Sequence, residues 1–517
     1  MKLKTARVIV SAVFFAVYCL IFTGILSVLS PAAGFFTAFQ AVPQLMLFLS
    51  TGALSGLVVF GLVILSAFLF GRLYCSFICP LGFLQDLFIH LRYRMKRSFL
   101  KTPNHKIPRY ILAAAAFIIL FAGTPFLMNV FEPFSNFGRI ASGVFEPALT
   151  GVRNIFVSGL EVFDIYAVKR IEANHIVPAV FAYTLGFLVF IGMFSFFKGR
   201  LYCNLLCPPG AVLGIASKKS LLSLRVEETK CNSCGLCSYE CKAGCIDSKT
   251  GAIDNERCIM CFNCIGACSK GAVVYTALPK SKAKAADNTR RQVLKGLTGA
   301  AAALAASSVP AALHAENTPV VKANPLVTPP GSGSLARFKK SCIACGLCVT
   351  ACPTKVLNHS VLEYGLDSIF VPRLDFASDY CLYECTKCSD ACPTGAIRKI
   401  SKPEKARIQI GVAKFITENC LVETRGSHCT ICNEFCPTKA VSLVPHKNGP
   451  DIPKVIEGIC VGCGACEYMC PVTPKAIYVE GSETHGRAGN PRRHSERGQR
   501  RGRQELPPPP PAGDFPF

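Results

Sequence analysis

Two cysteine-rich stretches, CNSCGLCSYEC (231–241) and CIMCFNCIGAC (258–268), decide the fold of the middle of the chain. Each has the spacing C-x2-C-x2-C-x3-C. In iron–sulfur proteins with this spacing, three close cysteines wrap one corner of a [4Fe-4S] cube and the fourth reaches a neighbouring cube. The spacing therefore predicts two crossed ligand sets: Cys231, Cys234 and Cys237 with Cys268, and Cys258, Cys261 and Cys264 with Cys241.

Zinc is the alternative metal for such cysteines. Zinc sites, however, usually take two cysteines from each of two knuckles instead of three within seven residues. The sequence departs from the bacterial ferredoxin spacing in one respect, because Lys242 and Ser269 replace the proline that usually follows the fourth cysteine. Cys245 is a spare thiol and a less favoured substitute ligand. We expect residues 225–278 to form a ferredoxin-like domain with two [4Fe-4S] clusters.

Four further groups of four cysteines lie between residues 335 and 481. The first and last have the regular spacing and a following proline. The middle two open with three and with eight intervening residues but keep a C-x2-C-x3-C-P core. This pattern predicts a second ferredoxin-like domain with four clusters, six in all, held by Cys342, Cys345, Cys348, Cys352, Cys381, Cys385, Cys388, Cys392, Cys420, Cys429, Cys432, Cys436, Cys460, Cys463, Cys466 and Cys470.

A repeated motif accounts for four of the six remaining cysteines. GRLYCSFICPLG (71–82) and GRLYCNLLCPPG (199–210) share G-R-L-Y-C-x3-C-P-x-G. A matched pair of this kind predicts two similar helix hairpins related by a pseudo-twofold axis. The four thiols then either converge on one metal or act as two redox dithiols. The structural alternative is a helix-ending turn in each copy, set by Gly and Pro. The residues concerned are Cys75, Cys79, Cys203 and Cys207.

Four uncharged apolar runs predict membrane-spanning helices, at 8–29, 46–70, 110–131 and 176–197. Each exceeds the ~20 residues that a helix needs to cross a bilayer, and buried core helices rarely lack charge for so long. Lys and Arg are concentrated before the first run, between the second and third, and after the fourth. The positive-inside rule then places both ends of this four-helix unit in the cytoplasm.

The overall composition agrees with a membrane iron–sulfur protein. Of the 517 residues 51% are hydrophobic, and the mean hydropathy is +0.37. The formal charge of +24 does not indicate a nucleic-acid partner, because Lys and Arg cluster beside the apolar runs and in the tail. No C-x-x-C-H motif and no G-x-G-x-x-G motif after a predicted strand occurs, so neither haem nor a dinucleotide domain is expected.

The segment TRRQVLK (289–295) is similar to a twin-arginine export motif, with Arg290 and Arg291 as the arginine pair. An uncharged, Ala-rich run (296–313) follows it. An ordinary fifth span is the alternative, and both interpretations carry the chain out of the cytoplasm. A folded export route suits a domain that must receive its clusters where they are assembled. We expect the segment to remain uncleaved as an anchor.

The predicted fold is an α-helical membrane bundle of four spans plus this fifth span, with two α+β ferredoxin-like domains of the bacterial polycluster type. The expected boundaries are 1–224 for the four-helix domain, 225–278 for the first ferredoxin domain, 279–316 for the linker and anchor, 317–334 for a flexible spacer, 335–481 for the second ferredoxin domain and 482–517 for a disordered or artefactual tail.

These motifs resemble two known families joined end to end. Residues 1–278 resemble the NapH-type membrane ferredoxins, and 289–479 resemble the NapG/MauM-type periplasmic ferredoxins. The C-x3-C-P pairs are also similar to those of NosR-type and CcoG-type proteins. The resemblance implies a multi-pass protein of the bacterial cytoplasmic membrane, with the N-terminus and first ferredoxin domain inside and the second in the periplasm. Its implied partners are membrane lipid, the quinone pool, the twin-arginine machinery and a periplasmic reductase or cytochrome.

Two functional hypotheses follow from this resemblance. In the first, quinol is oxidised at the four-helix unit and electrons leave for a periplasmic reductase, as in nitrate-reductase systems. In the second, the protein supplies electrons that mature or reactivate a periplasmic metalloenzyme. Asp86 and His90, four residues apart on the cytoplasmic side, and Glu132, at the outer end of the third run, are candidates for a quinone site; each is otherwise an ordinary interfacial residue.

Overall fold

The structure is a computed structural model that describes residues 2–24, 30–95, 99, 106–164, 166, 170, 177–247, 250–277, 326–446 and 449–489. The predicted export segment with Arg290 and Arg291 lies outside the described residues. The chain divides into two compact units. Unit 1 comprises 1–322, 336–373 and 387–399, and unit 2 comprises 323–335, 374–386 and 400–517. The predicted second ferredoxin domain is therefore divided between the two units.

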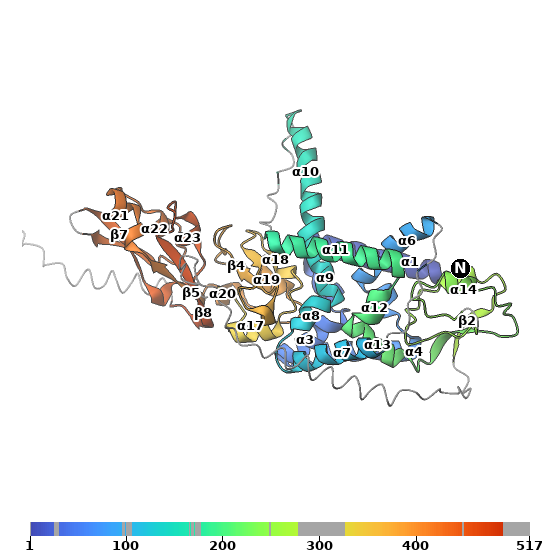
Figure 1. Cartoon of the computed structure of the whole chain (residues 1–517). Coiled ribbons are helices and arrows are strands. Elements are labelled where there is room, and N and C mark those ends of the chain that lie inside the picture. Colours follow the sequence, from blue (N-terminus) through green and yellow to red (C-terminus); the bar gives the residue numbers. More distant parts are fainter. Residues whose placement is uncertain are drawn as a thin grey trace, which may run out of the picture. The chain divides into compact units, whose positions relative to one another are not determined.

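Unit 1 is mainly helical (Figure 1). Its first half contains α1 (Lys2–Thr23), α2 (Ser30–Thr37), α3 (Ala41–Thr51), α4 (Leu54–Phe70), α5 (Tyr74–Phe77) and α6 (Pro80–Arg94). Its second half contains α7 (Lys106–Phe121), α8 (Phe126–Phe131), α9 (Pro133–Ile140), a π-helical turn (Ala141–Phe145), α10 (Glu146–Glu161), α11 (Pro178–Lys198), α12 (Leu201–Leu205) and α13 (Pro208–Ser217).

Two described helices are long and apolar enough to cross a membrane, Leu3–Thr23 within α1 and Pro178–Lys198 (α11). The other two predicted spans are not continuous helices. Gly52, at a left-handed φ of 72°, ends α3 and separates it from α4. Gly123, at φ 99°, and Pro125, which lacks a backbone N–H, separate α7 from α8. The apolar runs at 46–70 and 110–131 thus fold as broken helices.

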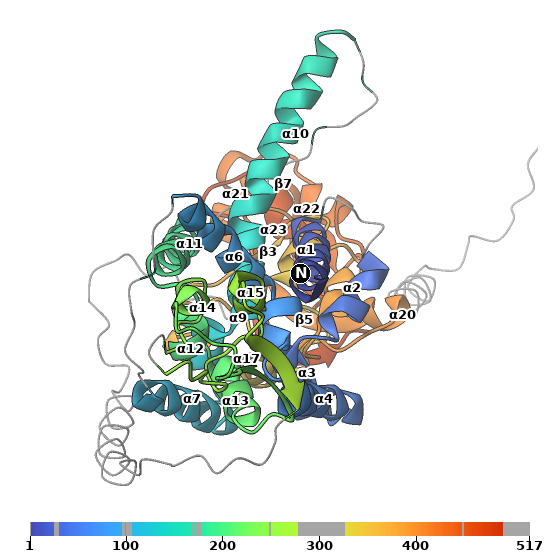
Figure 2. The same ribbon diagram turned by 90° about the vertical axis from the view of Figure 1, so that its right-hand side faces the viewer.

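Helix α10 lies between the apolar runs at 110–131 and 176–197. It projects away from the other helices in both views (Figure 1 and Figure 2). The helices of the unit pack through aromatic side chains. Phe22 and Phe134, for example, are fully buried with ring centroids 5.3 Å apart.

Two cysteine-rich segments complete unit 1. In the first, β1 (Leu222–Val226) pairs antiparallel with β2 (Val273–Ala277), and α14 (Leu236–Tyr239) and α15 (Asn263–Ala267) lie between them in sequence. Strand β1 begins at Leu222, before the predicted start of this domain at residue 225. The second segment contains α17 (Leu335–Ser341), α18 (Leu347–Ala351), β3 (Leu357–His359), β4 (Pro372–Leu374) and α19 (Lys387–Ala391).

Unit 2 is built on two antiparallel strand pairs. β5 (Ile408–Phe415) pairs with β8 (Ile477–Arg487), and β6 (Val441–His446) pairs with β7 (Gly449–Val455). Its short helices are α20 (Lys402–Lys405), α21 (Leu421–Arg425), α22 (Ile431–Glu434) and α23 (Ala465–Met469).

Two predicted boundaries are wrong at the edges of unit 2. Strand β8 continues through Arg487, so residues 482–487 are part of the sheet and not of a disordered tail. The part of the predicted flexible spacer that is described, 326–334, is packed. Thr328 is buried and hydrogen-bonded to His485 on β8. Pairing along the β8 backbone fixes both segments, and composition does not reveal that pairing.

Candidate iron–sulfur and thiol centres

The two G-R-L-Y-C-x3-C-P-x-G motifs form equivalent turns at the ends of α4 and α11. Gly71 (φ 79°) and Gly199 (φ 63°) stop these helices in a conformation that favours glycine. A short helix follows, and Pro80 or Pro208 then begins the next helix, where its missing N–H costs nothing. The four motif thiols, Cys75, Cys79, Cys203 and Cys207, are all buried.

The arginine of each motif crosses to the other copy. The Arg72 guanidinium donates to the backbone carbonyl of Cys203 at 3.1 Å, and that of Arg200 donates to the backbone carbonyl of Cys75 at 3.2 Å. Each arginine also lies 3.8 Å from the sulfur of the cysteine three residues after it. Both are fully buried, so the two turns form one centre with two cations beside its thiols.

The final glycine of each motif leaves room for the arginine that crosses from the other copy. A Cβ on Gly82 would lie 2.7 Å from Nη1 of Arg200, and a Cβ on Gly210 would lie 2.9 Å from Nη2 of Arg72. Such approaches are too close for any side chain, because core atoms already pack at crystal-like density. The final glycine of each copy therefore seats the arginine of the other copy.

Burial controls the thiol chemistry of this centre. Burial, together with the neighbouring thiols, raises the pKa of Cys79 and Cys207. Burial also raises the pKa of Cys75, against the opposing effect of Arg72. The pKa of these three thiols is raised even though Arg72 and Arg200 lie beside them, so further positive charge would be needed to deprotonate them. A metal centre would supply such charge.

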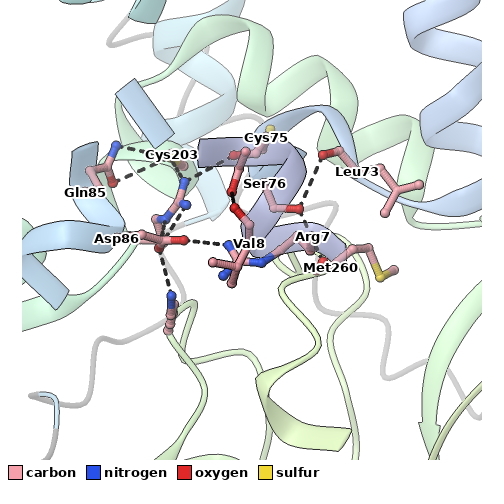
Figure 3. A network of polar contacts seen from close by, with 12 residues as sticks. Arg7, Val8, Leu73, Cys75, Ser76, Gln85, Asp86, Cys203 and Met260 are labelled. Atoms are coloured by element: carbon pink, nitrogen blue, oxygen red, sulfur yellow. Dashed lines mark hydrogen bonds and ion pairs between the residues drawn. The ribbon is translucent and has the colours of Figure 1, made fainter. Parts of the chain in front are cut away.

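Asp86 on α6 gathers three cations beside the thiol centre (Figure 3). Its carboxylate lies 2.6 Å from Nη1 of Arg7, 2.9 Å from Nη2 of Arg200 and 3.1 Å from Nζ of Lys242. Burial would raise the pKa of Asp86, but the three cations outweigh burial and hold the pKa well below its usual range. The charged network joins α1, both motif copies and the first ferredoxin segment.

The first ferredoxin segment packs directly on the two turns. The Ser76 hydroxyl donates to the backbone carbonyl of Met260 at 3.2 Å, and the backbone N–H of Arg200 donates to the carbonyl of Lys242 at 2.8 Å. Met260 lies between the cysteines of its group, and Lys242 follows Cys241. The thiol centre and a predicted cluster site are therefore in contact through the backbone.

The cysteines of this segment are arranged in the crossed sets that the spacing predicts. Cys231, Cys234, Cys237 and Cys268 line one cavity of about 110 Å³. Backbone N–H groups of Ser233 and Ala272 point at the sulfurs of Cys231 and Cys268, at 3.4 and 3.3 Å. Such N–H to sulfur bonds favour thiolate ligands, so the residues present fit a [4Fe-4S] cluster.

The second crossed set is buried. Burial raises the pKa of Cys264, and the thiols of Cys261, Cys258 and Cys241 add to this rise because they lie close by. The Cys245 sulfur is 3.5 Å from that of Cys241. This contact lowers the pKa of Cys241 to about 6. Cys245 thus adjoins the predicted site, as expected for a spare thiol.

The neighbours of the distal cysteines are compatible with the same exchange of the last cysteine, which the sequence left open. In unit 1, burial raises the pKa of Cys348, and the thiols of Cys342, Cys345, Cys392 and Cys388 add to the rise. In unit 2, burial raises the pKa of Cys466, and the thiols of Cys463, Cys460, Cys436 and Cys432 add to the rise. A narrow cavity of about 20 Å³ in unit 2 is lined by Cys420, Cys429, Cys432 and Cys470. Unit 1 also contains Cys352, and unit 2 also contains Cys381 and Cys385.

Within the part of the chain that is described, no three His, Cys, Asp or Glu side chains are arranged to hold a single metal ion. A [4Fe-4S] cube spreads its four ligands over separate iron atoms at its corners. The wider grouping of these thiols is compatible with such a cube.

The three predicted quinone-site candidates have different surroundings. Asp86 is occupied by its three cations. His90, one turn further along α6, is exposed and lines a cavity. Glu132 caps α9, where its buried side chain accepts a hydrogen bond from the Ser135 N–H, and burial raises its pKa.

Sequence reasoning missed the roles of Arg72, Arg200 and Lys242. The two arginines were visible as constant positions of the repeat. Nothing in the spacing indicated that they cross between copies. Lys242 stood out only as a departure from the usual proline, and its ion pair with Asp86 gives that departure a structural role.

The crossed cysteine sets define an iron–sulfur protein of the ferredoxin class, and comparisons with known proteins agree. A model described as a 4Fe-4S binding domain matches residues 53–98 and 180–226, the two motif copies. A model described as a 4Fe-4S dicluster domain matches 341–396 and 427–473. No solved structure matches the chain.

Curated relatives are more specific. The ferredoxin-type protein NapG of Escherichia coli is 32% identical over 212 residues, which are 38% of this chain and 88% of NapG. The methylamine utilization ferredoxin-type protein MauM of Methylorubrum extorquens is 31% identical over 218 residues, 40% of this chain and 97% of MauM. An uncharacterized protein of Methanocaldococcus jannaschii is 26% identical over 227 residues, 43% of this chain and 72% of its own length. The chain belongs to the NapG and MauM ferredoxin-type family and is an iron–sulfur electron-transfer protein.

Proposed function

We propose that this protein is a membrane-bound electron carrier that oxidises quinol and passes the electrons to a periplasmic reductase. The observation that supports this proposal best lies within unit 1. Two cysteine-rich segments contact opposite ends of the same apolar helices, α1 and α11. These helices have 22 and 21 residues, or roughly 30 Å at 1.5 Å per residue, close to the thickness of a bilayer core.

Contacts at the two ends of α1 illustrate this arrangement. Near its start, Arg7 joins the Asp86 network that includes Lys242 of the first ferredoxin segment. At its end, a Cβ on Gly24 would meet the Thr350 side chain of the second segment at 3.3 Å.

Helix α11 repeats the arrangement. Tyr183, near its start, packs on Phe370 of the second segment with ring centroids 4.3 Å apart. At its other end, Gly199 lies against the carbonyl of Lys242, so closely that a Cβ would be 2.2 Å away. Electrons that enter at one segment thus have a packed route along the thiol centre to the other.

The proposed orientation places the N-terminus and the first ferredoxin segment in the cytoplasm and the distal cysteine sets in the periplasm. The segment with Arg290 and Arg291 carries the chain across with the help of the twin-arginine machinery. Six [4Fe-4S] clusters would supply one-electron steps, which suits quinol because its two electrons must be separated. The chain's cysteines hold these clusters, and Cys75, Cys79, Cys203 and Cys207 hold a shared centre between them.

Reduction by quinol tests this proposal directly. The full-length protein with its clusters is placed in liposomes, duroquinol is added, and cluster reduction is followed by rapid-freeze EPR. We expect reduction at a catalytic rate, on the order of 10 s⁻¹. A protein that dithionite reduces fully and duroquinol does not reduce would overturn the proposal. Reduction slower than any enzyme turnover would favour the role of a maturation factor instead.

A further inference from the structure

A cavity of about 710 Å³ opens beside the Asp86 network. It lies between the start of α1, which contributes Arg7 and Val8, the second half of α6, which contributes His90, and the first ferredoxin segment, which contributes Glu240, Lys242 and Asn263. Its volume falls within the range of small-molecule sites, about 300–1,000 Å³.

The cavity adjoins one predicted cluster site. Glu240 and Lys242 flank Cys241 in sequence, and Asn263 directly precedes Cys264. Both cysteines belong to the crossed set that also contains Cys258 and Cys261. A molecule in this cavity would therefore touch the immediate neighbours of two cluster ligands, which is the position that an electron donor needs.

One polar atom in the cavity lacks a hydrogen-bond partner. Asn263 is only 4% exposed, and its Oδ1 has no hydrogen-bond partner among the described residues. A buried acceptor left unpaired costs about 1–3 kcal/mol, so this oxygen favours a ligand that donates a hydrogen bond. A hydroxyl is such a donor, and a hydroquinone carries two.

The remaining lining is mainly polar: Lys4, Arg7 and Lys242 are cationic, and Tyr93 and Tyr239 carry phenolic hydroxyls. The His90 imidazole is able to accept a proton. Val8 lines the cavity, and with Leu3 and Ile9 it is among the exposed apolar residues of α1. An isoprenoid tail would pack against this apolar surface, whereas a small polar metabolite would make no contact with it.

We propose that this cavity binds the hydroquinone head group, an inference that rests on the proposed function. One quinol hydroxyl donates to Oδ1 of Asn263. On oxidation both quinol O–H bonds break and two C=O bonds form. One proton goes to His90 and the other to solvent water, which reaches the cavity because His90 is exposed. A [4Fe-4S] cluster held by Cys241, Cys258, Cys261 and Cys264 would accept the two electrons one at a time.

Photolabelling of the full-length, cluster-loaded protein with an azidoquinone tests the site without measuring turnover. We expect cross-links, displaced by excess duroquinol, in peptides that contain residues 3–10, 89–95 and 239–242. His90→Leu should also slow duroquinol-driven reduction at least tenfold and leave the dithionite-reduced EPR spectrum unchanged. Arg94→Leu is the matched control, because Arg94 is exposed one turn further along α6 and does not line the cavity.

The outcomes separate this inference from the proposed function. Cross-links elsewhere, or H90L that is reduced by duroquinol at the wild-type rate, would overturn the cavity assignment while quinol oxidation stands. If excess duroquinol displaces the azidoquinone label from the wild-type protein but does not reduce the clusters, the proposed function fails, and the oxidation step fails with it. Labelling of the three peptides together with slow reduction of H90L alone would support both.

Discussion

The two motif copies in unit 1 share their thiols, arginines and glycines but differ in where their negative charge lies. In the first copy, Asp86 follows the final glycine by four residues. The equivalent position of the second copy is Gly214. Arg109 occupies the space beside it, so closely that a Cβ there would overlap its guanidinium, and Arg109 pairs with Glu256 at 3.1 Å.

The two copies thus share the contacts of their crossing arginines but differ in the anions nearby. The crossing arginines place the four thiols symmetrically, since each donates to a cysteine carbonyl of the other copy. Only Arg200 meets a carboxylate. Arg72 instead donates to Asn204 Oδ1 at 2.6 Å and to the carbonyl of Glu256. The carboxylate beside the second copy is therefore Glu256 of the first ferredoxin segment, whereas the carboxylate beside the first copy, Asp86, lies on the helix that follows that copy.

Removing the thiols of one copy should have the largest effect. If the four motif thiols form one shared centre, C75S/C79S and C203S/C207S should each abolish that centre completely. The quadruple variant should then lose no more iron than either double variant. Iron content by mass spectrometry and EPR of the reduced protein would measure this.

C19S is the control for this experiment, because Cys19 lies within α1 outside every predicted ligand set. It should retain all iron and full reduction by duroquinol. If each double variant lost only part of the iron and the quadruple variant lost the sum, the four thiols would form two separate dithiols, and the idea of a shared centre would fail.

The charge difference predicts unequal effects of removing the two carboxylates. Asp86→Asn leaves Arg7, Arg200 and Lys242 buried without an anion and should lower the free energy of unfolding by about 3–5 kcal/mol. Glu256→Gln leaves one cation, Arg109, and should cost less. Thermal unfolding of the cluster-loaded protein in detergent would compare them. Equal losses would show that the copies are balanced in charge as well as in geometry.

Substitution of Gly82 and of Gly210 should lower stability equally, because the two motif copies share this geometry. Gly82→Ala pushes a methyl group onto Arg200, and Gly210→Ala pushes one onto Arg72. Each should cost about 1–3 kcal/mol of stability through overpacking. Gly61→Ala is the control, since a Cβ there meets nothing within 4 Å. A loss of stability for only one of the two variants, measured by the same unfolding assay, would show that the two copies are not equivalent in their packing.

The sequence predicted the parts of this molecule that depend on spacing. The cysteine intervals predicted that Cys231, Cys234, Cys237 and Cys268 lie together, and these four line one cavity. They did not predict that 326–334 and 482–487 belong to unit 2, since strand pairing with β8 depends on distant partners. Hydropathy likewise recorded the apolar runs at 46–70 and 110–131 but not their interruption at Gly52 and Gly123.

The smallest expected effect concerns pH and tests whether Asp86 stays ionised. Its folded pKa lies below its value of about 3.9 in an unfolded chain, so its contribution to stability is complete above pH ~4 and is lost only as pH falls further. Hydrogen exchange of residues 3–10, corrected for intrinsic rates, should therefore show equal protection at pH 7 and pH 5. D86N should exchange faster at both values. Protection that falls in the wild type between pH 7 and 5 would mean that the carboxylate is protonated there, and the charge difference between the two copies would then vanish under mildly acidic conditions.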